Sequence, residues 1–294
     1  MAIIIDGNLT ASIIKNELKE KTSQLVNEKG IQPGLAVLLI GNDPGSLSYV
    51  NSKEKDCIEV GYNSIVFRKP ESTTEEEILA IVNEWNNDPS IHGILVQLPL
   101  PKHVDENKVI LTISPRKDVD GFHPESFGRL LIGLPGFVSC TPAGIMELFK
   151  RYNIELKGKH VVVVGRSNIV GKPMANLLYQ KTPYANAVVT ICHTGAKDLT
   201  YYTKQADVII AAVGVPEMIK ADDIKEGVVI IDVGINRVED ASRPKGYRLT
   251  GDVDYNSVLH KVSAITPVPG GVGPMTRAML LQNTFKSASG ELFQ

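Results

Sequence analysis

Short apolar runs that alternate with amphipathic segments constrain the fold of this chain more than any other sequence feature. In the first half, the runs at 34–41, 63–69 and 92–98 predict strands, and the segments at 45–60 and 74–86 predict helices. Repeated strand–helix–strand order is typical of a parallel sheet, because parallel strands need a crossover connection. The sequence therefore predicts an α/β fold for this half.

The second half continues the pattern with longer runs of valine and isoleucine. Its predicted strands and helices lie at 160–165, 187–193, 206–214, 227–234 and near 249, and at about 141–152, from 171 and at 275–288. Continuous Val/Ile runs are typical of strands that helices cover on both faces. We therefore expect a doubly wound parallel sheet here, separated from the first half by the Gly/Pro-rich segment 121–142.

Length and charge narrow the class of protein. The 294 residues suit two ordinary domains, and a net charge of -2 argues against a nucleic-acid-binding surface spread over the whole protein. The longest uncharged stretch, Leu130–Met146, is interrupted by glycine and proline, so we expect no membrane span. The start MAIIIDG lacks a basic segment, so we expect no secretory signal and a cytoplasmic location.

The cysteines give no sign of a metal site. Cys57, Cys140 and Cys192 are far apart in the sequence and form no CxxC pair. We expect free buried thiols and no metal.

A glycine pattern follows the first strand of the second half. The segment VVVVGRSNIVGKP places Gly165 at the end of a strand, Gly171 at the opening of a helix and Pro173 in its first turn. Glycines here let backbone N–H groups approach a phosphate, although Ser167 stands at the middle glycine of the usual dinucleotide motif. The spacing alone fits either a dinucleotide site or a structural turn.

Charge next to these glycines favours NADP over NAD. The second strand ends at Cys192-His193-Thr194 without the acidic residue that usually holds the ribose hydroxyls of NAD. Arg166 follows the first glycine, where it can meet a 2′-phosphate or remain a solvated loop charge. His193 fits a capping or packed imidazole better than a catalytic group.

A lysine interrupts the apolar face of the helix predicted at 45–60. That face consists of Ser46, Val50, Lys53, Cys57 and Val60. Tyr49 lies one turn before Lys53, so a ring and an amine share the face. Lys53 is either a functional amine or a lysine that extends its charge to solvent beside a packed tyrosine.

Two further polar positions stand out in the first half. Gln97 ends a buried strand, where its amide needs partners and serves either as a structural clamp or as a functional group. Asp118 and Asp120 precede Gly121 at the predicted boundary, and one of the two is expected to form the turn.

At these residues the chain resembles the bifunctional methylenetetrahydrofolate dehydrogenase/cyclohydrolase family. The blocks that carry the resemblance are YVNSK (49–53), GILVQLPLP (93–101), KDVDGF (117–122), CTPAG (140–144), VVVVGRSNIVGKP, DVGI (232–235) and PGGVGPMT (269–276). Their order along nearly the whole chain is far more specific than any single motif.

The resemblance implies a two-domain architecture. An α/β folate-binding catalytic domain is expected at 1–140 plus 275–294, and a Rossmann-like NADP-binding domain at 141–274. Two long helices, one opened by Thr141 and one at 275–288, are expected to join them, with the active-site cleft between the domains. A homodimer is also implied.

The resemblance further implies two reactions in one site. The first oxidises 5,10-methylenetetrahydrofolate to the 5,10-methenyl cation with NADP, and the second hydrolyses that cation to 10-formyltetrahydrofolate. Lys53 is implied as the key group of the hydrolysis, with Gln97 holding it. Tyr49 is implied to stack on the folate and Asp120 to bind the pterin.

The remaining implied contacts are binding positions. Substrate-binding residues are Tyr49, Lys53, Gln97, Leu98, Asp120, Gly270 and Gly271. Cofactor-binding residues are Thr141, Gly165, Arg166, Ser167, Ile169, Val170, Thr194, Gly214, Ile235 and Val272. Of these, Arg166, Ser167 and Thr194 are implied to surround the 2′-phosphate.

Two other functions compete with this one. The chain is alternatively a monofunctional or NAD-preferring dehydrogenase, or a folate- or dinucleotide-binding module without turnover. The presence together of Lys53, Gln97 and Asp120 argues against a binding module. Two departures from the family pattern are Arg277, expected to face solvent or a partner subunit, and the loop 181–187, expected at the rim of the cofactor site.

Overall fold

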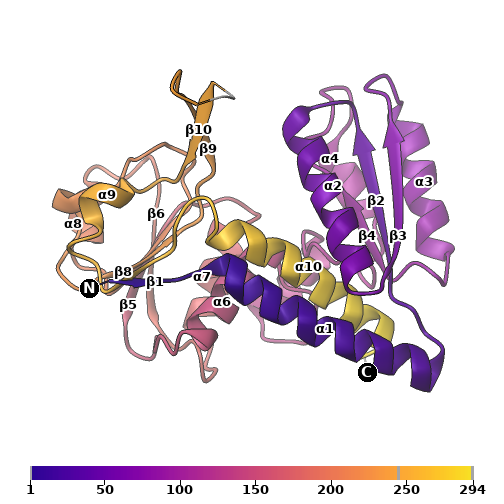
Figure 1. Cartoon of the computed structure of the whole chain (residues 1–294), viewed down its shortest axis with the longest axis horizontal. Coiled ribbons are helices and arrows are strands. Elements are labelled where there is room, and N and C mark those ends of the chain that lie inside the picture. The colour runs from indigo at the N-terminus through magenta and orange to yellow at the C-terminus, as the bar shows by residue number, and fades with distance from the viewer. Residues whose placement is uncertain (1, 244–245, 293–294) are drawn as a thin grey trace. The chain divides into compact units, whose positions relative to one another are not determined.

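A computed structural model describes residues 2–243 and 246–292, and the chain divides into two compact units (Figure 1). The three-stranded unit comprises Ser12–Cys140 and Arg277–Gln294, and the six-stranded unit comprises Met1–Ala11 and Thr141–Thr276. Each unit has its own parallel sheet, as the alternating sequence pattern predicts.

The sheet of the three-stranded unit has the strand order β3-β2-β4. These strands are β2 (Gly34–Ile40), β3 (Asn63–Lys69) and β4 (Gly93–Val96). Both pairings are parallel, and Leu35 lies opposite Ser64 on one side and Gly93 on the other. Because β2 is central, all of its residues are buried, whereas the edge strand β3 is largely exposed.

Helices accompany this sheet, and those that connect β2 to β3 and β3 to β4 form its crossover connections. The helices are α1 (Gly7–Lys29), α2 (Pro44–Glu59), α3 (Glu75–Asn87), α4 (Glu106–Thr112), α5 (Pro124–Leu131) and α10 (Val272–Ser289). The start of α3 is fixed by a capping box between Thr74 and Glu77. Its buried residues Ile78, Val82 and Trp85 belong to the same hydrophobic core as the strand residues of β2 and β4.

The sheet of the six-stranded unit has the order β1-β11-β8-β7-β5-β6, and all five pairings are parallel. Its strands are β1 (Ile3–Ile4), β5 (His160–Val164), β6 (Val188–Cys192), β7 (Val208–Ala211), β8 (Val229–Asp232) and β11 (Ala264–Ile265). The chain runs from β5 outward to β6 and then returns to β7 on the other side of β5. This reversal is the mark of the doubly wound fold.

Short helices and one hairpin complete the six-stranded unit. They are α6 (Cys140–Arg151), α7 (Gly171–Tyr179), α8 (Leu199–Thr203), η1 (Ala221–Asp223), α9 (Tyr255–Val258) and the hairpin of β9 (Asn236–Glu239) with β10 (Tyr247–Thr250). The strand predicted near 249 is β10, which pairs antiparallel with β9 in a separate two-stranded sheet. The expectation that it belongs with the parallel strands was therefore wrong. The predicted strand at 187–193 is the sheet edge, so Val188 and Ile191 are exposed.

The unit boundaries fall inside or at the start of helices. They lie within α1, at the first residue of α6 and within α10. Residues 2–11, which the sequence analysis assigned to the catalytic domain, belong to the six-stranded unit, because Ile3 and Ile4 pair in parallel with β11. Residues 1, 244, 245, 293 and 294 of the predicted domains lie outside the described residues. The joining role of the helices at 141 and 275–288 stays a prediction.

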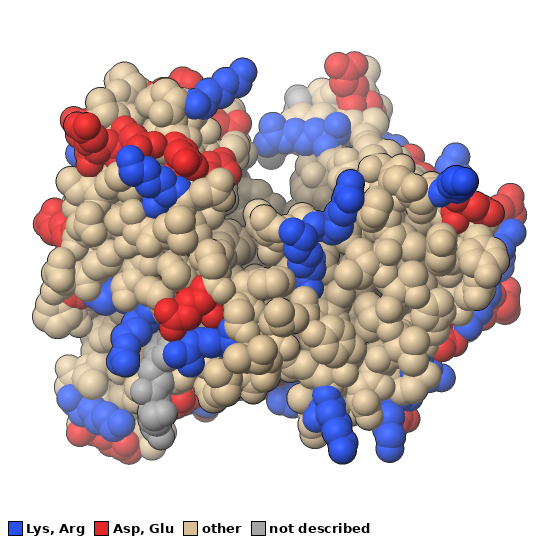
Figure 2. Space-filling model, turned by 180° about the vertical axis from the view of Figure 1, so that it is seen from behind, with Lys and Arg blue, Asp and Glu red and all other residues tan. Residues whose placement is uncertain are grey.

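Charge on the surface is mixed in sign. On the face drawn in Figure 2, Lys and Arg residues are interspersed with Asp and Glu residues. Among the described helices, none is both long and apolar enough to cross a membrane.

Candidate functional site

Lys53 projects from a helix whose start is fixed locally. Asp43 caps α2 by accepting the Ser46 N–H at 2.7 Å, and Pro44 occupies the first turn, where no backbone donor is needed. Val50 and Cys57, which flank Lys53 on the same face, are buried. Lys53 is half-buried, and its Nζ donates a hydrogen bond of 3.0 Å to Oε1 of Gln97.

The amide of Gln97 is oriented by its own backbone. Its N–H donates to the Leu38 carbonyl at 2.9 Å, which extends the pairing of β4 with β2 by one residue. Its side-chain Nε2 donates to the Leu98 carbonyl at 2.7 Å. The remaining Oε1 therefore accepts from Lys53, so Gln97 contacts the lysine directly.

Asp120 shares the electrostatic environment of Lys53. Burial lowers the pKa of Lys53, and the Asp120 carboxylate partly offsets this by favouring the ammonium. Burial likewise raises the pKa of Asp120, and the charge of Lys53 opposes that rise. Lys53 therefore loses its proton more easily than an exposed lysine does.

Asp118, the first aspartate of the KDVDGF segment, is the one that forms the predicted turn. Asp118 is buried and accepts the N–H groups of Phe122 at 3.1 Å and His123 at 2.9 Å, and the hydroxyl of Ser126 at 2.7 Å. Asp118 therefore forms the turn that starts α5. Its burial raises the pKa of this carboxyl to about 6.

The remaining substrate-binding predictions in this unit are Tyr49 and Leu98, each close in the sequence to one member of the Lys53–Gln97 pair. Tyr49 is one turn before Lys53 on α2, and its side chain is 42% exposed, so a face of its ring is accessible. Leu98 follows Gln97 directly and is half-buried.

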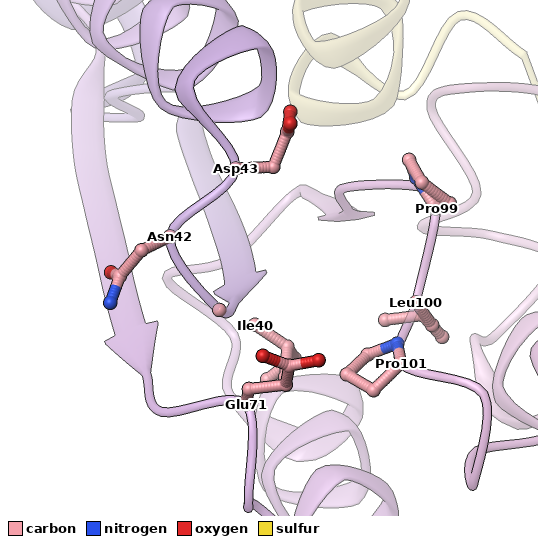
Figure 3. Close-up of a pocket in the computed structure, with 8 residues that line it drawn as sticks. Ile40, Asn42, Asp43, Glu71, Pro99, Leu100 and Pro101 are labelled. Atoms are coloured by element: carbon pink, nitrogen blue, oxygen red, sulfur yellow. The ribbon is translucent and has the colours of Figure 1, made fainter.

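A cavity of about 420 Å³ in this unit is lined by residues from three segments of the chain (Figure 3). It separates the loop that follows β2 from the segment Pro99–Pro101, which follows Leu98. Ile40, Leu100 and the prolines give it an apolar wall, and Asp43 and Glu71 give it carboxylates. The combination of apolar walls with a few polar groups is typical of small-molecule sites.

The environment of Arg277 differs from the one that was predicted. It was predicted to face solvent or a partner subunit, but its Nη1 lies 3.3 Å from Oδ2 of Asp56. Asp56 is buried, and Lys15 from α1 holds its other oxygen at 3.0 Å. A buried carboxylate attracts cations because burial disfavours an unpaired charge.

The glycine motif lies at the reversal point of the six-stranded sheet. Gly165 follows β5 with φ of +143°, and a Cβ there would come within 2.2 Å of the Ala212 carbonyl beyond β7. A Cβ on Gly171 would come within 2.4 Å of the Gly165 carbonyl. Only glycine fits at both positions, and the chain packs closely where doubly wound folds bind ligands.

The loop between these glycines is organised by Ser167. Its Oγ accepts the N–H groups of Val170 at 3.1 Å and Gly171 at 3.3 Å at the start of α7. Arg166 and Ser167 are exposed, and Ile169 is 40% exposed. The loop thus presents a cation and a hydroxyl to solvent at a helix N-terminus, a favourable place for a phosphate.

The turn after β6 is closed by an imidazole. Nδ1 of His193 accepts the Gly195 N–H at 3.0 Å, which is a capping interaction. The neighbouring Thr194 is exposed.

Other predicted positions of this unit divide between exposed and buried. Gly214 and Ile235 are exposed at the ends of β7 and β8. Gly270 accepts the Asn8 N–H at 3.0 Å, and the hydroxyls of Thr141 and Thr276 are 2.9 Å apart. Gly271 and Val272 are buried at the start of α10.

Sequence reasoning missed two buried carboxylates next to Gly214 and Ile235. Asp232 ends β8 and accepts backbone N–H groups from the segments after β8 and β10, and Asp252 follows β10 and accepts those of the loop after β7. Acids at the ends of apolar strands were the available signal, in the segments DVGI and GDVD.

All three cysteines are free and buried. Burial raises the pKa of Cys57 to about 12. Across residues 2–243 and 246–292, no group of His, Cys, Asp and Glu side chains has a geometry that would hold a metal ion.

These features define a two-unit α/β protein with a dinucleotide-type sheet edge and a partly buried lysine bound to an amide. Comparison with known proteins identifies the family. The profile "Tetrahydrofolate dehydrogenase/cyclohydrolase, catalytic domain" matches residues 5–120, and the profile for its NAD(P)-binding domain matches residues 139–292. The chain belongs to the tetrahydrofolate dehydrogenase/cyclohydrolase family.

Similar proteins cover nearly the whole chain. The bifunctional protein FolD of Chlorobium chlorochromatii is 58% identical over 97% of each chain, and that of Chloroherpeton thalassium is 56% identical over 97% of this chain and 98% of its own. The bifunctional FolD enzyme of Campylobacter jejuni has a similar structure, with a TM-score of 0.93 and 49% identity over 99% of this chain and 100% of its own. The Trypanosoma brucei FolD, solved with NADP cofactor and an inhibitor, also has a TM-score of 0.93, with 36% identity over 100% of this chain and 99% of its own.

Proposed function

We propose that this chain oxidises 5,10-methylenetetrahydrofolate with NADP and hydrolyses the resulting 5,10-methenyl cation to 10-formyltetrahydrofolate. The observation that carries the proposal is the hydrogen bond from Lys53 to Gln97, with Asp120 close enough to affect the lysine's pKa, in a chain 58% identical to a bifunctional FolD. The first reaction removes a hydride from the methylene carbon. The second adds water to that carbon, opens one carbon–nitrogen bond and releases a proton.

Lys53 acts in the hydrolysis. The methenyl substrate is cationic, so an ammonium at Lys53 would repel it, whereas a neutral amine can take a proton from the attacking water. Burial on the face of α2 lowers the pKa of Lys53 and increases the fraction of neutral amine. Gln97 holds the amine in position through its Oε1.

The folate itself is held by residues around the lysine. Asp120 supplies a carboxylate for the N–H groups of the pterin, a charge-assisted contact. The exposed ring of Tyr49 supplies a stacking surface, and Leu98 an apolar one. Gly270 and Gly271 complete the proposed substrate contacts.

The six-stranded unit fits NADP. The close approach of Gly165 to Ala212 leaves no room for a side chain, so the backbone itself meets a ligand at the sheet edge where dinucleotides bind. When bound, NADP accepts the hydride. Arg166, Ser167 and Thr194 would hold the 2′-phosphate, and Thr141, Gly165, Ile169, Val170, Gly214, Ile235 and Val272 would hold the rest.

The lysine is tested by Lys53→Met, with Lys55→Met as the matched control. Lys55 lies on the same helix but is exposed. We expect Lys53→Met to reduce hydrolysis of added methenyltetrahydrofolate by about 10²- to 10⁴-fold and Lys55→Met to leave it unchanged. Enzyme-catalysed hydrolysis that persists in Lys53→Met would remove the lysine from the mechanism.

The cofactor preference is tested by Arg166→Ala, with Arg237→Ala as an exposed control in the same unit. We expect Arg166→Ala to weaken NADP binding by roughly tenfold or more and NAD binding much less, because only NADP has the 2′-phosphate. Equal losses would mean that Arg166 does not contact that phosphate and would favour an NAD-preferring enzyme.

The competing functions are separated by one assay. Turnover of 5,10-methylenetetrahydrofolate is followed with reduced cofactor and methenyl product measured separately. Reduction of NADP with little free methenyl supports both activities, and equal accumulation of both products indicates a monofunctional dehydrogenase. No reduction with either cofactor indicates a binding module. A homodimer, a cytoplasmic location and a part in purine biosynthesis are further proposals that rest on the family alone.

A further inference from the structure

Two buried carboxylates in the six-stranded unit have no role in the proposed chemistry. Asp232 is 3% exposed and Asp252 is fully buried. Burying a carboxylate is unfavourable unless donors surround it, so the identity of the donors shows what each group does.

Asp252 accepts hydrogen bonds from two separate segments at the carboxyl edge of the sheet. Its Oδ2 accepts the N–H groups of Val213 at 2.7 Å and Gly214 at 2.9 Å, in the loop after β7. Its Oδ1 accepts the side-chain amide of Asn236 at 2.9 Å, in the segment after β8. Gly214 and Ile235, two of the proposed cofactor contacts, lie in these two segments.

Asp232 fixes Asp252 in turn. Its Oδ1 accepts the N–H groups of Gly234 at 3.0 Å and Asp252 at 2.9 Å, and its Oδ2 accepts that of Val253 at 3.0 Å. The backbone closes tightly around the pair, because a Cβ on Gly251 would lie 1.8 Å from Oδ2 of Asp232. The three loops after β7, β8 and β10 are therefore joined through two side chains.

The chemistry of Asp252 requires a carboxylate. All three of its partners are N–H donors, and a carboxylate accepts with both oxygens. An asparagine there would direct an NH₂ group at another donor. Hydrogen bonds to an ionised acceptor are also stronger than neutral ones, which suits a group that must fix loops.

We infer that Asp252 is a positioning residue for the dinucleotide site, holding the loop of Gly214 and the segment of Ile235 at the spacing that NADP needs. The inference rests on the proposed function, because it assumes that this sheet edge binds the cofactor. Asp252 itself is fully buried, so we expect it to act through the loops that it holds and not by direct contact with the cofactor. Its effect is expected in cofactor affinity and not in the hydrolysis at Lys53.

The test is Asp252→Asn, with Asp254→Asn as the matched control. The control removes the same charge two residues away, at a side chain that caps α9 by accepting the Ser257 N–H. NADP binding is measured by calorimetry, and hydrolysis is measured with methenyltetrahydrofolate supplied directly and no cofactor present. We expect Asp252→Asn to raise the Kd and KM for NADP by about tenfold or more, with hydrolysis and kcat at saturating NADP within about twofold.

The other outcomes are also informative. A folded Asp252→Asn protein with wild-type NADP affinity overturns the inference, as does an equal loss in Asp254→Asn. If Asp252→Asn loses both hydrolysis and cofactor binding, the residue has a general structural role, and the inference is also overturned. If Asp252→Asn does not fold, Asn236→Ala removes one of the three donors and is expected to raise the Kd by about fivefold, and an unchanged Kd contradicts the inference.

Failure of the proposed function gives a different result. If the wild-type protein itself does not bind NADP, the proposed function fails before any variant is compared. Hydrogen exchange of the Val213 and Gly214 amides then still tests whether Asp252 holds this loop. Protection is expected in the wild type and is expected to be reduced in Asp252→Asn.

Discussion

Arg277 on α10 and Asp56 on α2 form an ion pair, with Nη1 of the arginine 3.3 Å from Oδ2 of the carboxylate. Asp56 lies less than one helical turn beyond Lys53, so the arginine's charge reaches the proposed catalytic amine. Arg277 contributes to lowering the pKa of Lys53, although burial is the larger cause. The departure from the family pattern therefore lies beside the site.

Arg277→Met is expected to shift the pH dependence of hydrolysis. Removing the cation raises the pKa of Lys53, so the neutral amine forms at higher pH. The acidic limb of the rate profile should therefore move to higher pH. The measurement is methenyltetrahydrofolate hydrolysis against pH, with the exposed Arg243→Met as control. An unchanged profile would show that Arg277 acts only on the stability of α10 against α2.

Gln97→Leu is expected to slow hydrolysis by about 10- to 100-fold, because Lys53 loses the acceptor that holds its amine. Gln97→Glu is expected to act differently: a carboxylate at this distance raises the pKa of Lys53 and moves the acidic limb to higher pH. Gln32→Leu, which removes an exposed amide, is the control. Equal profiles for Gln97→Glu and wild type would contradict the direct contact.

Asp232 is expected to make the six-stranded unit less stable as pH rises. Burial raises the pKa of Asp232 from 3.8 to about 7, so the folded state holds its proton between these values while the unfolded state does not. The stabilisation is complete below about pH 4 and is lost as pH rises to about 7, with a ceiling of about 4 kcal/mol.

Urea unfolding followed by circular dichroism at pH 5 and pH 8 measures this effect. The difference in unfolding free energy between the two pH values should shrink in Asp232→Asn and persist in the exposed Asp222→Asn. Trp85 is the single tryptophan and lies in the other unit, so its fluorescence is an internal control. A wild-type pH dependence in Asp232→Asn would refute the assignment.

Gly165→Ala is expected to destabilise the six-stranded unit by roughly 2 kcal/mol or more and to weaken NADP binding. The new Cβ would meet the Ala212 carbonyl at 2.2 Å, and φ of +143° is unfavourable for alanine. Gly128→Ala is the control, since nothing lies within 4 Å of its added Cβ on α5. The control should be neutral or slightly stabilising because alanine favours helix. A stable Gly165→Ala protein with unchanged NADP affinity would contradict the close-packing argument.

Local patterns were enough for most of the fold. The strand at 34–41 and the helix at 45–60 appear within one or two residues of their predicted bounds, because continuous apolar runs and helical spacing are local properties. The helix α1 was not predicted, although its buried Ala11, Ile14, Leu18 and Leu25 have helical spacing. The strand near 249 was predicted, but its antiparallel pairing with β9 was missed, since strand direction depends on the partner.

The candidate site divides in the same way. The sequence by itself determined the residue types that matter, because an amine at Lys53 on an apolar face, an amide at Gln97 and paired glycines around Arg166 each break or complete a local pattern. Only the tertiary structure decided their partners: that Lys53 donates to Gln97, that Arg277 pairs with Asp56, and that Asp252 joins the loops after β7 and β8. These contacts join residues far apart in the chain, and a buried charge takes its partner from whichever element the fold places beside it.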